Sequence, residues 1–295
     1  MPTSNNEQVA VITGASGTIG RATIGVLLKK GMRIVAASRS TSRLEQLVAQ
    51  HYPRAKDRIV LKETDVRNVE ETRDLIEFAV RSCGRLDILI NGAGSYGAIG
   101  LVRDVPPVEW KNAIETNLFG AYNCCYFALR YMIPAARGRI INIAGGGSTG
   151  PLENLSSYAV SKAGMVRLTD TLAHEVKQHG ILVNAILPGA VDSPMQDQLL
   201  LAGDKAGPWY EKIKALRDSG SGGISAALTG HLVEFLTFGP GKDLTGKLIS
   251  ARYDRFKNWA TEEVELIAKT EMFTLRRIDP TTLKPLFSDP RLLGL

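Results

Sequence analysis

The chain has 295 residues, of which 44% are hydrophobic, and a formal net charge of +6. A chain of this length can bury one large core, and a single α/β domain of this size is ordinary. Because it has no apolar run near ~20 residues, no signal-peptide pattern, no clustered basic patch and no disulfide framework among its three cysteines, we expect a cytoplasmic protein without membrane, nucleic-acid or metal partners.

Short apolar segments alternate with amphipathic segments along the chain. The apolar segments lie at about 9–12, 33–37, 58–62, 86–91, 138–143 and 181–186, and they are typical of buried parallel strands. Helical patterns lie between them, for example at 75–80 and after Pro107. The alternation predicts a doubly wound, Rossmann-type α/β fold over residues 1–250, followed by a C-terminal extension over residues 251–295.

A glycine-rich turn with Gly14, Gly17 and Gly20 joins the first predicted strand to a helix that ends at Gly31. Glycines let a backbone approach a ligand, and the free N–H groups at a helix N-terminus attract negative charge. The turn therefore predicts a pyrophosphate site, although a tight connection without a ligand has the same composition.

Tyr158 and Lys162 lie four residues apart on a predicted helix, so their side chains share one face. A free phenol has a pKa near 10, and a nearby ammonium group favours the phenolate. The pair is therefore suited to acid–base chemistry at neutral pH, although a pair on a helix surface has the same spacing.

The turn at 13–20 and the Tyr158/Lys162 pair, in this order, resemble the short-chain dehydrogenase/reductase family, with its Thr-Gly-x-x-x-Gly-x-Gly and Tyr-x-x-x-Lys patterns. The segments 91–94, 116–120 and 188–195 resemble further motifs of this family, so the resemblance covers roughly residues 8–250. It implies hydride transfer between a nicotinamide cofactor and a carbonyl or secondary-alcohol substrate.

The resemblance also implies a role for each matching residue. Tyr158 would exchange the proton on the substrate oxygen, Lys162 would lower the Tyr158 pKa and bind the nicotinamide ribose, and Asn117 would hold a water that links Lys162 to solvent. For Asn117, a structural amide bonded to neighbouring backbone is the alternative. The expected cofactor-binding residues are Gly14, Ser16, Thr18, Ile19, Gly20, Ser38, Arg39, Asp65, Val66, Asn91, Ala93, Gly94, Tyr158, Lys162, Pro188, Gly189, Val191 and Ser193.

Cofactor choice is expected at the end of the second strand. An acidic side chain there would bind the adenosine ribose diol and repel a 2′-phosphate. The chain has Ser38 and Arg39 instead, a hydroxyl and a fixed cation that suit phosphate oxygens. We therefore expect NADP(H) rather than NAD(H), although a surface arginine after a strand is also common.

One expected residue is missing. Family members usually carry a serine thirteen residues before the tyrosine, where this chain has Gly145. Three explanations stay open: Ser148 reaches back into the site, the backbone N–H groups of 145–147 bind the substrate oxygen, or catalysis has been lost. Loss of one such donor commonly costs ~10²–10³ in rate.

The segments after Met195 also depart from the family. Residues 196–222 form a long, glycine-containing connection that we expect to be a mobile lid. In the extension, a helix is expected over residues 262–271, with Val264, Ile267 and Ala268 on one face. The extension packs on the domain or on a neighbouring subunit, or else Arg252, Arg255 or Trp259 lines the pocket and favours an anionic or sugar-like substrate.

Two functions therefore stay open. The first is an NADP(H)-dependent oxidoreductase acting on a small or sugar-derived ketone, and the second is a non-catalytic NADP(H)-binding protein that regulates or scaffolds a partner. The resemblance implies a homodimer or homotetramer, formed through the helices that contain Trp110 and Tyr158.

Overall fold

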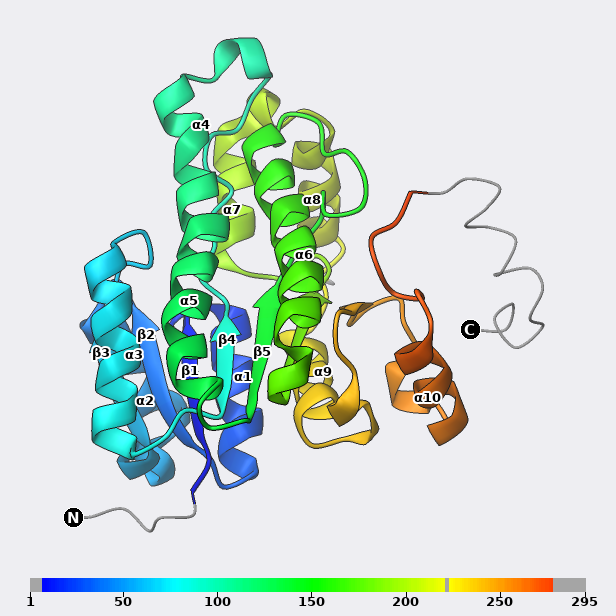
Figure 1. Ribbon diagram of the computed structural model, residues 1–295. Coiled ribbons are helices and arrows are strands. Elements are labelled where there is room, and N and C mark those ends of the chain that lie inside the picture. Colours follow the sequence, from blue (N-terminus) through cyan, green and yellow to red (C-terminus); the bar gives the residue numbers. More distant parts are fainter. Residues whose placement is uncertain (1–6, 221–222, 278–295) are drawn as a thin grey trace.

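The centre of the fold is a seven-stranded, fully parallel sheet in the order β3-β2-β1-β4-β5-β6-β7 (Figure 1). The computed structural model describes residues 7–220 and 223–277. The strands are β1 (Val9–Thr13), β2 (Arg33–Ser38), β3 (Ile59–Glu63), β4 (Ile88–Asn91), β5 (Gly138–Ile143), β6 (Ile181–Leu187) and β7 (Leu248–Ser250). The predicted strands and the doubly wound α/β fold are confirmed.

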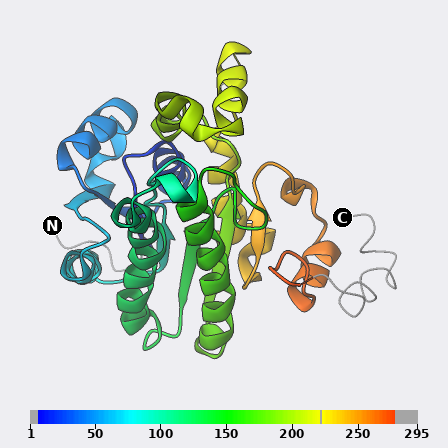
Figure 2. The ribbon, with the colours of Figure 1, turned by 90° about the horizontal axis from the view of Figure 1, so that it is seen from above.

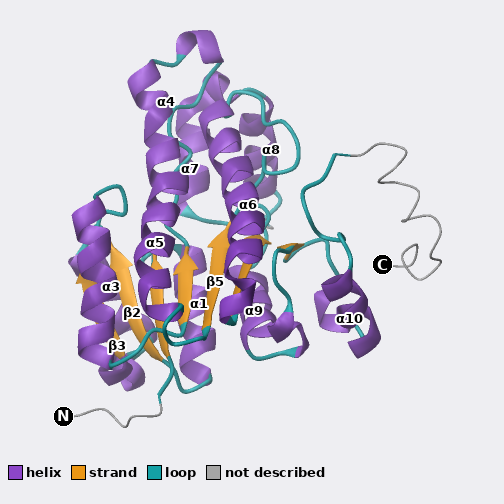
Figure 3. Ribbon diagram, in the orientation of Figure 1, coloured by secondary structure: helices purple, strands orange, loops and turns teal. Residues whose placement is uncertain are grey.

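Helices cover both faces of the sheet, so the molecule has three layers (Figure 3). One face carries α1 (Thr18–Lys29), α2 (Thr41–His51) and α9 (Ala226–Thr237). The opposite face carries α3 (Val69–Cys83), α5 (Gly120–Met132) and α6 (Ser156–Val176). The segment α4 (Pro107–Ile114) continues into α5 through a π-helical segment, Glu115–Phe119.

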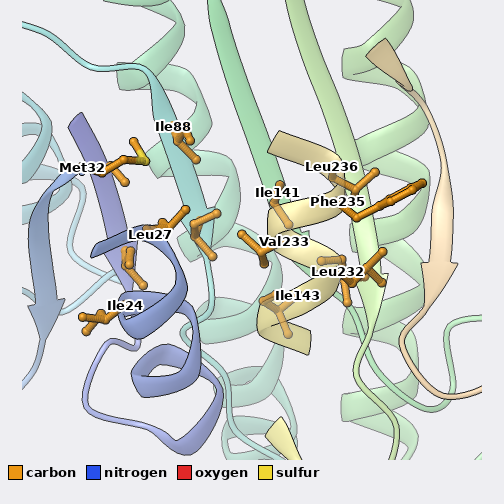
Figure 4. Packing of buried hydrophobic residues seen from close by; sticks show 14 of the residues in the cluster. Ile24, Leu27, Met32, Ile88, Ile141, Ile143, Leu232, Val233, Phe235 and Leu236 are labelled. Carbon is orange, nitrogen blue, oxygen red and sulfur yellow. The ribbon is translucent and has the colours of Figure 1, made fainter. Parts of the chain in front are cut away.

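Strand β1 is apolar throughout because both of its faces are buried. Ala10 and Ile12 belong to the core under α1 and α9, whereas Val9 and Val11 belong to the core under α3 and α5. Figure 4 shows how side chains of α1 and α9 meet those of the central strands on the first of these faces. Each fully buried aliphatic side chain of this kind contributes about 1.5–3 kcal/mol to folding, so the carboxyl ends of the strands are held on a rigid support.

The connection after β6 is largely helical, not the loop that its length and glycines predicted, and its mobility as a lid stays a prediction. It folds into α7 (Pro194–Ala202) and α8 (Pro208–Asp218), each with a proline in its first turn, where the missing N–H costs nothing. Arg217 of α8 joins the two helices, with Nη2 at 2.8 Å from Asp197 Oδ1 and 3.0 Å from Asp192 Oδ1. The glycines lie instead in the short connections, where Gly203 and Gly207 have positive φ angles.

The described part of the extension is integrated into the core at the β7 end of the sheet (Figure 2). The predicted helix is present as α10 (Thr261–Lys269), with Val264 and Ile267 buried, although Ala268 is exposed. Leu248 of β7 donates its N–H to Phe273 O at 2.7 Å, so the extension covers the free edge of the last strand. The predicted boundary at residue 250 stays a prediction, and residues 278–295 lie outside the described residues.

One part of the pocket alternative for the extension is wrong. Trp259 is buried in the core, where its ring contacts Phe235 and Phe273, whereas pocket roles for Arg252 and Arg255 stay predictions. Arg255 is exposed, and the Arg252 side chain lies beside Gly189.

Within the described residues, no helix is both long enough and apolar enough to cross a membrane. The same part of the chain contains no group of three His, Cys, Asp or Glu residues that could hold a metal ion.

Candidate active site

The predicted site residues lie where the chain leaves the carboxyl ends of the strands. The sheet order reverses between β1 and β4, beside the first glycine turn, and open α/β sheets generally bind their ligands at such a switch point. Gly14 follows β1, Ser38 ends β2, Asn91 ends β4, and 188–193 follows β6. The fold therefore brings these segments to one edge of the sheet.

Two positions of the first turn leave no room for a side chain. A Cβ on Gly14, which has a φ of +64°, would lie 2.5 Å from Gly92 O, and a Cβ on Gly20 would lie 2.5 Å from Gly14 O. Helix α1 starts after Gly17 without a side-chain cap, so its first N–H groups remain available to an anion.

The turn departs from the family pattern in one place. The middle glycine is Gly17, one position earlier than the pattern requires, and Thr18 occupies the usual place as the first residue of α1. The expected match to Thr-Gly-x-x-x-Gly-x-Gly is therefore inexact.

Asn91 points into the sheet interior. Its Nδ2 donates to Asn142 Oδ1 at 2.8 Å and contacts Cys125 Sγ at 3.3 Å. After it, the N–H groups of Gly92 and Ala93 both donate to Thr13 Oγ1 at 3.2 and 3.3 Å. The bonds from Gly92 and Ala93 hold the β4 turn against the β1 turn, and the expected role of Asn91 in cofactor binding stays a prediction.

The end of β2 carries a cluster of hydroxyl groups beside a free cation. Ser38 Oγ donates to Ser40 O at 2.9 Å, and Ser40 Oγ lies 3.0 Å from Ser42 Oγ. Arg39 is exposed, and its charge contributes to the lowered pKa of Asp65, which the hydrogen bond from Arg67 chiefly causes. The local chemistry is suited to an added phosphate group.

Tyr158 and Lys162 share one face of α6, as expected, and both are buried. Lys162 Nζ lies 5.7 Å from the centre of the Tyr158 ring and donates to Ile143 O, at the end of β5, at 2.7 Å. A Cβ on Gly94 would lie 3.6 Å from Lys162 Nζ and 3.4 Å from Asn117 Oδ1, so the amide and the ammonium groups both approach this glycine.

Both polar atoms of the Asn117 amide have hydrogen-bond partners within the protein. Its Oδ1 accepts from Ser95 N at 2.8 Å, and its Nδ2 donates to Ser95 O at 2.9 Å and to Ser161 Oγ at 2.8 Å. The π-helical segment presents the amide to these partners, and such segments often occur at functional sites. The side chain matches the structural alternative, and the water relay stays a prediction.

Burial has the largest effect on the pKa values of Tyr158 and Lys162. It raises the pKa of Tyr158 well above its ordinary value, with a smaller effect from Tyr96, and it lowers the pKa of Lys162 to about 7. The expected lowering of the Tyr158 pKa by Lys162 is absent in this arrangement, because the ammonium group faces Ile143 O and both groups have lost their hydration.

Gly145 leaves room for the reacting phenol. A Cβ at this position would lie 2.2 Å from Tyr158 Oη. The chain then turns tightly, with a φ of +85° at Gly147, so that the buried Ser148 donates its hydroxyl to Gly145 O at 2.6 Å. Ser148 therefore does fold back towards position 145, as the first of the three explanations requires.

Apolar side chains surround the phenol. Tyr158 clusters with Leu155 of the preceding turn, Leu199 of α7 and Ile213 of α8. The ring of Tyr96 meets the Tyr158 ring edge-on, with the centroids 4.8 Å apart. Sequence reasoning placed a lid at 196–222 but did not identify Leu199 and Ile213, and it missed Tyr96, which stands only two positions after the 91–94 segment.

The turn 188–193 lies beside the segment that returns from α8. Gly189 has a φ of +82°, and a Cβ there would meet Ile224 Cδ1 at 2.3 Å. Ile224 donates its N–H to Ala190 O at 2.8 Å, and Val191 pairs with Ile224. The predicted cofactor-binding turn is thus hydrogen-bonded to the segment that follows α8.

Comparison with known proteins finds a match to the family model for short chain dehydrogenases over residues 8–202. A 3-oxoacyl-(acyl-carrier-protein) reductase of Thermotoga maritima is 34% identical over 194 residues, which cover 65% of this chain and 77% of the relative. A reductase with the same description from Synechocystis sp. is 31% identical over 198 residues, covering 67% of this chain and 79% of the relative.

Two solved structures are similar throughout the domain. A variant of actinorhodin polyketide ketoreductase with NADPH is 26% identical, with a TM-score of 0.75 over 84% of this chain and 97% of that one. An NAD⁺-bound xylitol dehydrogenase is 28% identical, with a TM-score of 0.73 over 83% of this chain and 98% of that one.

We predict that Gly145→Ala destabilises the protein by about 1–3 kcal/mol, because the new methyl group overlaps Tyr158 Oη. The loss should shrink in a Tyr158→Phe background, which lacks that atom. Gly146→Ala is the matched control, since its Cβ would meet Leu152 at an ordinary 3.5 Å. Urea unfolding of the four variants measures these free energies, and an equal loss in both backgrounds would contradict the overlap.

We also predict that the wild type gains stability relative to Lys162→Met as the pH rises from 7 to 9. The folded pKa of Lys162 is about 7, below the ~10.4 of an unfolded lysine, so the unfolded chain binds more protons in this window. The difference in unfolding free energy should therefore rise by on the order of 1 kcal/mol per pH unit. A flat or falling difference, measured in matched buffers, would show that Lys162 keeps an ordinary pKa.

Proposed function

The chain belongs to the short-chain dehydrogenase family, and we propose that it is an NADP(H)-dependent oxidoreductase that interconverts a ketone and a secondary alcohol. The observation that carries the proposal is the meeting of Tyr158, Lys162 and Gly94 at the strand ends that also carry the first glycine turn. Relatives described as reductases support a carbonyl substrate.

The residues present fit the proposed cofactor. The cradle at Gly14 and Gly20, where side chains have no room, and the uncapped start of α1 would hold the pyrophosphate. The hydroxyl of Ser38 and the cation of Arg39 would hold a 2′-phosphate. NADP(H) would then supply or accept the hydride at its nicotinamide ring.

The adenine ring would lie at Asp65 and Val66, and the nicotinamide ring beside Gly94 and the turn 188–193. Val66 is already fixed, because its carbonyl accepts from Asn123 Nδ2 at 3.2 Å. A solved ketoreductase with NADPH supports this choice, and an NAD⁺-bound xylitol dehydrogenase supports the other cofactor. The absence of an acid at positions 38 and 39 favours NADP(H).

Tyr158 and Lys162 have different roles in proton transfer. In reduction, Tyr158 donates its hydroxyl proton to the substrate oxygen as the carbonyl carbon receives the hydride, and in oxidation it takes the proton back. Lys162, with a pKa of about 7, exchanges protons readily near neutral pH and can restore the proton of Tyr158. Its bond to Ile143 O keeps it within the site between turnovers.

Ser148 is the residue that we assign to the substrate oxygen in place of the missing serine. Ser148 is 3% exposed, and its hydroxyl donates to the carbonyl of Gly145, the residue that faces Tyr158 Oη. To act on the substrate, this hydroxyl would have to release Gly145 O. The backbone N–H groups of 145–147 are the competing donors.

A non-catalytic, nucleotide-binding protein is the second candidate. Gly145 favours it, because the usual serine is missing, and so does the raised pKa of Tyr158. Both candidates bind NADPH, but only an enzyme consumes it.

We further propose a homo-oligomer that uses the outer face of α5. Phe119, Tyr122 and Tyr126 are spaced along one side of this helix and remain about half exposed. Val160 on the neighbouring α6 is 50% exposed, whereas Trp110 is engaged inside the chain, with Nε1 donating to Ser156 Oγ. Sedimentation equilibrium measures the mass in solution, and a monomer at micromolar concentration would exclude this assembly.

We expect NADPH oxidation with at least one member of a panel containing benzil, deoxybenzoin, ethyl acetoacetate, fructose and xylulose. Tyr158→Phe should lower kcat by about 10²–10⁴ and Ser148→Ala by about 10²–10³, because each removes a group that acts on the substrate oxygen. The exposed neighbour Thr149 provides the control Thr149→Ala, which should keep its rate. Undiminished turnover in Ser148→Ala would mean that the backbone N–H groups of 145–147 bind the substrate oxygen. NADPH binding without any turnover would favour the non-catalytic candidate.

We expect Arg39→Asp to lower the preference for NADPH over NADH by about 10–100-fold, because it replaces a charge-assisted phosphate contact by repulsion. The ratio of the two dissociation constants, measured by fluorescence titration, checks this. Arg43→Asp is the control for a change of charge on the neighbouring helix. An unchanged ratio would mean that the cation at position 39 does not meet the 2′-phosphate.

A further inference from the structure

Gln196 is a buried amide that the described part of the chain leaves without a partner. Its side chain is 2% exposed, and neither Oε1 nor Nε2 makes a hydrogen bond there. A buried amide that has lost its water and found no replacement destabilises the fold. The neighbouring Gln198 is exposed, so polar side chains on this helix are not buried as a rule.

The amide lies on the face of the lid that covers the phenol. Gln196 is three residues before Leu199 on α7, so the two side chains point in the same direction. Leu199 is 1% exposed and belongs to the apolar cluster around Tyr158, and Met195 packs against the same cluster. Gln196 therefore lies on the face of α7 whose apolar residues pack around Tyr158.

The cluster that this face of α7 covers has an apolar wall. It is completed by Leu152, Leu155 and Ile213. The acids nearest in the chain, Asp192 and Asp197, are both paired with Arg217. An uncharged, largely apolar substrate would replace the contacts of this wall.

We propose that Gln196 hydrogen-bonds a second oxygen of the substrate. The substrate is then an uncharged, apolar ketone with a further carbonyl or hydroxyl group. This deepens, and rests on, the oxidoreductase function proposed above. An amide both donates and accepts, so it recognises either group. Tyr158 acts on one oxygen while Gln196 holds the other, and the distance between them selects which carbonyl is reduced.

Gln196→Met tests the proposal, because methionine keeps the length of the side chain and removes both polar atoms. Benzil and deoxybenzoin are matched ketones that differ by one oxygen. We expect kcat/KM for benzil to fall about 10-fold more than for deoxybenzoin, as the loss of one hydrogen bond implies. Gln198→Met on the exposed side of α7 is the control and should leave both values unchanged.

Two readouts separate this role from a structural one. Gln196→Met should bind NADPH as the wild type does, and its melting temperature should stay equal or rise, because an unpaired amide has been removed. Equal losses on the two ketones, weaker NADPH binding, or a wild type that prefers deoxybenzoin, fructose or xylulose to benzil would each overturn the proposal. A wild type that oxidises NADPH with no carbonyl would count instead against the oxidoreductase function itself.

Discussion

The site depends on two close approaches that only glycine permits. Gly14 brings the turn after β1 against the turn after β4, and Gly145 admits the hydroxyl of Tyr158. Each approach removes the volume of one side chain from a crowded edge of the sheet. Without these contacts, the residues after β1, β4 and β5 would stand too far apart to act on one small molecule.

The same crowding explains the charge state of the pair. Tyr158 and Lys162 are both almost fully enclosed, so the loss of hydration outweighs their mutual attraction. The bond from Lys162 to Ile143 O keeps a donor of the lysine occupied inside the protein. A site of this kind keeps Tyr158 in its neutral form and lowers the pKa of Lys162 to about 7, which is consistent with a wall of leucine, isoleucine and tyrosine side chains.

Sequence reasoning succeeded where spacing alone determines geometry. The alternation of apolar segments predicted the sheet, and the four-residue interval predicted that Tyr158 and Lys162 share a face of α6. It failed where long-range packing decides the outcome. Trp259 was one of three alternative pocket residues but belongs to the core, and the connection after Met195 was expected to be a loop but contains two helices.

The same limit hid Gln196, because nothing in a sequence distinguishes a buried, unpartnered glutamine from its exposed neighbour Gln198. The hydrogen bonds of Asn117 could not be predicted from the sequence either, because its partners Ser95 and Ser161 come from two other segments. Motifs identified the reacting groups, whereas the surroundings that set substrate preference became visible only in three dimensions.

The integration of the extension has a consequence for synthesis on the ribosome. Phe256, Trp259 and Ile267 complete the same core that α1 begins, so the core contains residues from both ends of the chain. A nascent chain that has emerged only as far as β7 would expose that strand's unpaired edge and the apolar surface that these side chains cover. Native folding of this protein is therefore expected to finish only after Phe273 has emerged from the ribosome, and the chain is most exposed to aggregation between the emergence of β7 and that of Phe273.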